Sequence, residues 1–153
     1  MNFGILLSKE GRIDEAMVYL NRAVELDPDY DMGYYSLGDA LMKQKKYIQA
    51  SESYAKSLQI KPQNALARFN LGKSLAAAGK HQNAIFHYKL AAGKDQFISH
   101  QVYYFMGNSF YQLGRYPEAI EAYRKSLLEK PDYKQAMLAL SNTKKIIKVL
   151  QEK

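Results

Sequence analysis

The chain has 153 residues, of which 47% are hydrophobic and 24% charged, a composition typical of a folded globular protein and not of a disordered one. No apolar run approaches the roughly 18 residues that a membrane span needs, and the absence of cysteine excludes disulfides, thiolate zinc sites and cysteine nucleophiles. The net charge of +7 is uneven, because residues 1–30 carry three basic and six acidic side chains whereas residues 31–153 carry nineteen and nine. The basic excess is scattered, which is typical of a solvated surface, so nucleic-acid binding is not expected. We expect a cytoplasmic protein without a membrane segment.

Apolar residues at three- and four-residue steps predict amphipathic helices along the whole chain. A short helix over 1–8 precedes a helix over 13–26, which ends at the Asp27-Pro28-Asp29 break because proline cannot continue the hydrogen-bond ladder. Three further pairs are expected over 32–44 and 47–60, 65–78 and 81–92, and 99–113 and 116–129. A last helix over 132–150 has no partner after it.

The helix pairs are copies of one another. The alanines Ala16, Ala50, Ala84 and Ala119 are separated by 34, 34 and 35 residues, and the glycines Gly4, Gly38, Gly72 and Gly107 by the same intervals. Such a period indicates a repeat array. We expect one domain made of an incomplete repeat (1–30), three full repeats (31–64, 65–99 and 100–133) and a capping helix (134–153).

The turn inside each pair also recurs. Gly11, Gly79 and Gly114 stand between paired helices, where a residue in the left-handed conformation closes the first helix. The second repeat has Lys45 at this position, which would cost about 1 kcal/mol if the left-handed conformation is kept.

Further residues recur at fixed offsets in each copy. The second copy carries Tyr34-x-x-Leu37-Gly38, followed by Ala50, Tyr54 and Pro62, and this pattern resembles that of the tetratricopeptide repeat family. The other copies carry Tyr103-x-x-Met106-Gly107-x-x-Phe110 with Ala119, Tyr123 and Pro131, then Leu71-Gly72 with Ala84 and Tyr88, and Phe3-Gly4 with Ala16, Leu20 and Pro28. The resemblance covers nearly all of the chain. It implies an all-α, antiparallel helix-turn-helix solenoid, a right-handed superhelix that serves as a general protein-interaction scaffold.

Two departures from the repeat carry predictions of their own. The third copy lacks the terminal proline and gains a residue, which predicts an irregular junction at Gly93-Lys94-Asp95-Gln96, with Phe97 and Ile98 covering apolar surface. The last helix is expected to act as a polar cap. Its inward residues would be Met137, Leu140, Ile147 and Leu150, and its outward residues Lys134, Lys144, Lys145, Lys148 and Lys153.

The first repeat begins partway through a helix. This start suggests a piece of a longer protein, and it leaves an apolar edge around Phe3, Leu6 and Leu7. We expect this edge to pair with something, for which a second copy of the chain is one candidate.

No catalytic, metal-binding or cofactor-binding pattern is found in the sequence. The histidines His81, His87 and His100 are not at metal-ligand spacing, and no Gly-rich phosphate loop follows a strand. We therefore expect a protein that is not an enzyme and needs no cofactor or metal.

The resemblance to the family implies that the first helix of each pair lines a concave groove. The residues expected to line it form three columns: Met32, Leu66 and Gln101; Tyr35, Phe69, Tyr104 and Leu138; and Asp39, Lys73, Asn108 and Asn142. An apolar ladder beside a polar one suits an amphipathic peptide or helix. The alternative is that Tyr35, Phe69 and Tyr104 simply pack between helices. The lysine–asparagine–arginine clamp by which some members hold chaperone carboxylates is absent, because only Asn70 fits it.

The leading hypothesis is therefore a protein-interaction scaffold that binds a peptide or helix of a partner protein in its groove. Two alternatives stay open: a self-assembly module whose first repeat drives oligomers, and a targeting segment of a larger enzyme.

Overall fold

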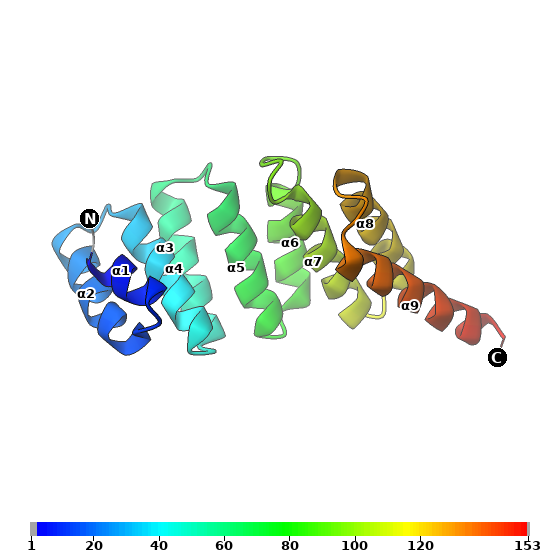
Figure 1. Ribbon diagram of the computed structural model, residues 1–153, viewed down its shortest axis with the longest axis horizontal. Helices are drawn as coiled ribbons and strands as arrows, with labels where there is room; N and C mark the ends of the chain where they lie inside the picture. Colours follow the sequence, from blue (N-terminus) through cyan, green and yellow to red (C-terminus); the bar gives the residue numbers. More distant parts are fainter. Residues whose placement is uncertain (1–2, 153) are drawn as a thin grey trace. The chain divides into compact units, whose positions relative to one another are not determined.

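The computed structural model describes residues 3–152, and all regular structure within that range is α-helical (Figure 1). The all-α prediction is confirmed, and the helix bounds fall close to those expected from the apolar period. The helices are α1 (Phe3–Lys9), α2 (Ile13–Leu26), α3 (Asp31–Lys43), α4 (Tyr47–Ile60), α5 (Ala65–Ala77), α6 (His81–Ala91), α7 (Ser99–Gln112), α8 (Tyr116–Glu129) and α9 (Lys134–Gln151).

The turns inside the helix pairs use the left-handed conformation that the sequence predicts. Gly11, Gly79 and Gly114 have φ of 83°, 77° and 71°, and Lys45 adopts φ of 60° in the same place. In the second repeat Lys46 N donates to Leu41 O at 2.9 Å and Lys45 N to Met42 O at 3.0 Å, which satisfies the last carbonyls of α3. The lysine therefore keeps the turn at the expense of backbone strain.

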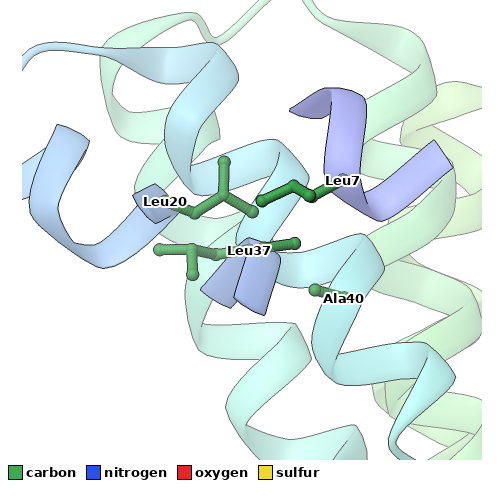
Figure 2. Close-up of a cluster of buried hydrophobic side chains, with 5 residues drawn as sticks. Leu7, Leu20, Leu37 and Ala40 are labelled. Carbon is green, nitrogen blue, oxygen red and sulfur yellow. The ribbon is translucent and has the colours of Figure 1, made fainter. Parts of the chain in front are cut away.

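The chain forms two compact units that divide after Ala78. In the first unit α1 packs on α2, α2 on α3, α3 on α4 and α4 on α5. Leu7, Leu20 and Leu37 come from three successive helices and meet in one buried cluster (Figure 2). The prediction that Leu7 lies on an open edge is wrong, because its side chain is fully buried on α2 and α3, whereas Phe3 is half exposed.

The glycine column leaves space for a large side chain of the following helix. A Cβ added to Gly38 would lie 2.6 Å from Tyr54 Cε1, and one added to Gly107 would lie 2.5 Å from Tyr123 Cε1. Real carbon atoms do not approach so closely, so each tyrosine ring fills the volume that its glycine leaves empty. In repeats two and four the two helices therefore pack in the same way, with the tyrosine ring of the second helix against the glycine backbone of the first.

In the second unit α6 packs on α7, α7 on α8, and α9 lies on α8 and also meets α7. The junction between α6 and α7 is irregular as predicted, since it runs over residues 92–98 and includes Gly93 at φ of 71°. Asp95 organises it: its Oδ1 accepts from Phe97 N at 2.8 Å and its carbonyl from Ser99 Oγ at 2.7 Å. The prediction that Phe97 covers apolar surface is wrong, because this ring is 79% exposed and only Ile98 is half-buried.

The inward face of α9 differs from the predicted one. Ala136 and Thr143 are buried and Leu140 and Ile147 half-buried, a stripe at helical steps, whereas the predicted inward residues Met137 and Leu150 are exposed. Met137 lies about 100° around the helix from Ala136, which turns it away from α8. The exposure of Lys134, Lys144, Lys145 and Lys148 is confirmed, and Lys153 lies outside the described residues.

Candidate functional site

The predicted residues of the first unit lie on α3 and α5. Asn70 Nδ2 of α5 donates to Tyr35 Oη of α3 at 2.9 Å, so the two helices share the face that carries these side chains. Met32 and Leu66 are 42% and 40% exposed and offer apolar surface there. Phe69 is only 2% exposed, so its ring belongs to the packing, with Lys73 Nζ 5.4 Å from its centroid. The two exposed residues, and not the aromatic one, can reach a ligand.

Asp39 is the charged centre of this face. Tyr54 Oη donates to Asp39 Oδ1 at 2.6 Å, and the rings of Tyr35 and Tyr54 meet edge to face at 5.7 Å. Burial raises the pKa of Asp39 above its ordinary value, against the opposing effects of the Tyr54 hydrogen bond and of Lys73 and Lys43. Burial and the nearby Asp39 charge raise the pKa of Tyr35 to about 12. The hydrogen bond from Tyr54 fixes the direction of the Asp39 carboxylate.

The predicted residues of the second unit lie on α7 and α9. Tyr104 is half-buried, and its ring meets those of Tyr133 at 5.4 Å and Tyr123 at 6.0 Å. Tyr123 Oη donates to Asn108 Oδ1 at 2.8 Å, across the same sequence separation of 15 that joins Tyr54 to Asp39. The column that holds Asp39 and Asn108 thus anchors the repeat tyrosine. Sequence reasoning missed this role, although the constant separation was visible.

A hollow of about 290 Å³ brings two predicted residues together in the second unit. Its lining comes from α7, α8 and α9 and consists of Asn108, Tyr111, Gln112, Tyr123, Ala139, Asn142 and Thr143. The lining holds amides, hydroxyls and methyl groups and no ionised side chain. Beside it, Leu138 is 64% exposed, and Gln101 is half-buried on α7. This hollow can take an uncharged side chain or the amide groups of an extended backbone.

A larger hollow, of about 540 Å³, lies in the first unit between α2 and α4. Leu37 and Leu41 of α3 form part of its lining, and Met106 and Phe110 of α7 occupy the same repeat positions in a hollow of about 290 Å³ between α6 and α8. Because these hollows recur at matching positions, they follow from the spacing of successive second helices.

The described part of the chain contains neither a cluster of metal-ligating side chains nor a membrane-spanning helix. Within residues 3–152 there is no group of three or more His, Asp or Glu side chains placed to hold a metal ion. Over the same range no helix has the length and apolar character to span a bilayer.

The ring of His100 packs on that of Tyr133, with 5.0 Å between the ring centroids. Burial is the main cause that lowers the pKa of this imidazole, and the charge of Lys130 lowers it further.

Comparison with protein families finds matches over most of the chain. A family model described as TPR repeat matches residues 6–45 and 38–79, and one described as tetratricopeptide repeat matches residues 100–133.

Among curated proteins, the chain is 33% identical over 67 residues to the protein O-mannosyl-transferase TMTC3 of Homo sapiens, which covers 44% of this chain and 7% of that protein. It is 31% identical over 90 residues to the small glutamine-rich tetratricopeptide repeat-containing protein 2 of Mycosarcoma maydis, with coverage of 59% and 25%. The chain thus spans a quarter or less of the length of these relatives.

Among solved structures, MamA superposes with a TM-score of 0.88 at 24% identity, covering 94% of this chain and 83% of that one. The first TPR domain of Spaghetti (RPAP3), solved with the HSP90 peptide SRMEEVD, superposes with a TM-score of 0.72 at 21% identity, covering 76% and 92%. At these identities the likeness supports the fold alone.

Proposed function

Because the chain belongs to the tetratricopeptide repeat family, we propose that it is a protein-interaction module that seats a peptide segment of a partner protein on the inner faces of its repeats. The observation that carries the proposal is the exposure of apolar side chains on α3 and α5 at positions that differ between copies. Met32 and Leu66 are 42% and 40% exposed beside the anchored Tyr35 and Asp39. An apolar surface next to preorganised polar groups is what an amphipathic segment needs.

The fold itself supports this proposal. The Spaghetti domain, which shares the fold, is bound to a peptide of HSP90. In this chain the second unit adds a hollow whose lining includes Asn108 and Asn142, and it also adds the exposed side chain of Leu138. That the residues predicted from the sequence, from Met32 to Asn142, contact the partner remains a prediction.

The test compares three variants whose wild-type side chains are almost equally exposed. Met32→Asp and Leu66→Asp place a charge on the inner face, and Ile48→Asp, at 41% exposure on α4, places one on the outer face. A partner identified by affinity capture is titrated against each variant. The two inner variants should weaken binding at least about tenfold, as loss of an interface anchor does, and Ile48→Asp should not. Equal effects of all three would refute the proposal. The half-buried Tyr35 and Tyr104 are poorer test sites, since removing them also disturbs packing.

Self-assembly is a second candidate, favoured by one observation. Phe3 and Tyr19 meet edge to face at 5.0 Å and are both about half exposed, and Val18 and Leu26 on the same helix α2 are exposed as well. This apolar surface would be covered by a second copy. Multi-angle light scattering over a range of concentrations separates the two functions. A species of monomer mass at every concentration counts against self-assembly.

A further inference from the structure

Helices α7 and α9 of the second unit carry basic side chains and no carboxylate of their own. Helix α7 contains no Asp, Glu, Lys or Arg, and α9 contains Lys134, Lys144, Lys145 and Lys148 but no carboxylate. Within residues 3–152 only Lys148 of these four has an ion-pair partner, Glu152, at 3.9 Å. The potential along α9 is therefore positive and largely uncompensated.

An apolar stripe runs along α9 beside these lysines. Residues 138, 142, 146 and 149 fall within an arc of about 80° on the helix, whose centre lies about 100–120° from the buried positions 136 and 143. Leu138 and Val149 of this stripe are exposed, Ile146 is half-buried, and Asn142 lines the hollow next to α7. Figure 1 shows the C-terminal half of α9 extending beyond α7 and α8, which leaves the end of the stripe open.

The order of these features around α9 is set by helix geometry. Lys134 and Lys145 border the stripe on one side, and Ala139, which lines the hollow, borders it on the other. A helical or extended segment lying on the stripe would meet the neutral hollow with one flank and the lysines with the opposite flank. The surface formed by the hollow, the stripe and these lysines is called the α7–α9 surface below.

The face of α9 that corresponds to the α8-facing side of α7 carries different residues. The position 34 residues after Gly107 is Ser141, and the position 34 residues after Phe110 is Lys144. A Cβ at Gly107 would come within 2.5 Å of Tyr123, so Ser141 leaves no slot for a repeat tyrosine, and Lys144 stands where α7 has a buried ring. This face lies beyond the lysine side of the stripe and is separate from the α7–α9 surface.

We propose that the α7–α9 surface takes an amphipathic segment of a partner protein whose polar flank is acidic, with apolar side chains on Leu138 and Val149 and carboxylates on the α9 lysines. This inference rests on the proposed function and names the chemistry of its ligand. The hollow, with its directional amides, favours a peptide over a lipid surface, which offers no defined groups to it.

The test uses the full chain and two fluorescein-labelled amphipathic helical peptides. Both carry leucine at positions i, i+3, i+4 and i+7; one has glutamates along one flank, and the other has lysines in their place. Fluorescence anisotropy should show the acidic peptide binding at least about tenfold more tightly, from two or three exposed ion pairs, with affinity that falls as salt is raised. Leu138→Asp and Lys145→Glu should each weaken it several-fold, and Arg124→Glu, a charge reversal of an exposed residue of α8, should not.

Equal affinities for the two peptides, preference for the basic one, no binding of either, or insensitivity to Leu138→Asp would each overturn the inference. Binding to phosphatidylserine vesicles without binding of the acidic peptide would overturn it too. The proposed function fails separately, because it is judged by the natural partner and by Met32→Asp and Leu66→Asp. If these variants still weaken the partner while the acidic peptide does not bind, only the present inference falls.

Discussion

The fit between Gly38 and Tyr54 makes Gly38→Ala a sharp test of how the repeat is held together. Helix propensity alone predicts that alanine in the interior of α3 stabilises the protein by about 1 kcal/mol. The structure predicts the opposite sign, because the new methyl carbon would lie 2.6–2.8 Å from three ring atoms of Tyr54. The ring cannot retreat without disturbing its 2.6 Å hydrogen bond to Asp39.

The magnitude follows from two costs and one gain. Overpacking of a filled site costs about 1–3 kcal/mol, and weakening a hydrogen bond to a charged acceptor costs about 1.5 kcal/mol more. Subtracting the propensity gain leaves a net destabilisation of about 2.5 kcal/mol, or roughly 5–10 °C in Tm for a chain of this size.

Urea unfolding followed by circular dichroism measures this change, with the slope of the transition as the check that the unfolded state is unaltered. The matched control is the same substitution in a Tyr54→Ala background, where the slot is empty and Gly38→Ala should stabilise by about 1 kcal/mol. A stabilising effect of Gly38→Ala in the wild-type background would refute the account of the slot.

The remaining predictions concern single positions. Lys45→Gly should stabilise by about 1 kcal/mol by relieving the strained φ of 60°, and Gly114→Ala should destabilise by a similar amount, both in urea unfolding. Ser126→Ala should lower the free energy of unfolding by about 1 kcal/mol, because it removes the 2.7 Å hydrogen bond from Ser126 Oγ to the carbonyl of His100. Ser57→Ala should leave the free energy of unfolding unchanged, because Ser57 Oγ is buried without a hydrogen-bond partner in the described range. Equal losses in the two variants would contradict this reasoning. The raised pKa of Asp39 means that its protonated form favours folding, so the free energy of unfolding should fall as pH rises above 3.8, and Asp39→Asn should remove that fall.

The sequence predicted the helices because each has one clear apolar face and a turn residue that ends it. Lys45 is instructive here, since only its place in the repeat indicated a left-handed turn, and its φ of 60° confirms it. The predicted inward face of α9 is wrong because apolar residues lie on several faces of this helix, so periodicity alone does not show that Ala136 is buried and Met137 exposed. The prediction for Phe97 is wrong for a different reason: hydrogen bonds to Asp95 set the conformation of the loop, and apolar contacts of Phe97 do not.

The predicted groove residues separate in the structure into two roles that the sequence could not distinguish. Asp39 and Asn108 hold the repeat tyrosines, and Phe69 is buried in the packing. Met32 and Leu138 are exposed and neither hold a repeat tyrosine nor fill the core. Burial depends on neighbours far along the chain, so one column of a repeat alignment mixes residues that build the fold with residues that can reach a ligand.

Chemical-shift mapping on the isotope-labelled chain tests the central claim most directly, once a peptide of the identified partner is in hand. Binding on the inner faces predicts that the largest amide shifts fall in α3 and α5 of the first unit, around Met32 and Leu66, or in α7 and α9 of the second, around Asn142, while the amides around Ile48 on α4 stay in place. Shifts concentrated on α2, α4, α6 and α8 would show that the partner uses the outer helices and would contradict the proposed function.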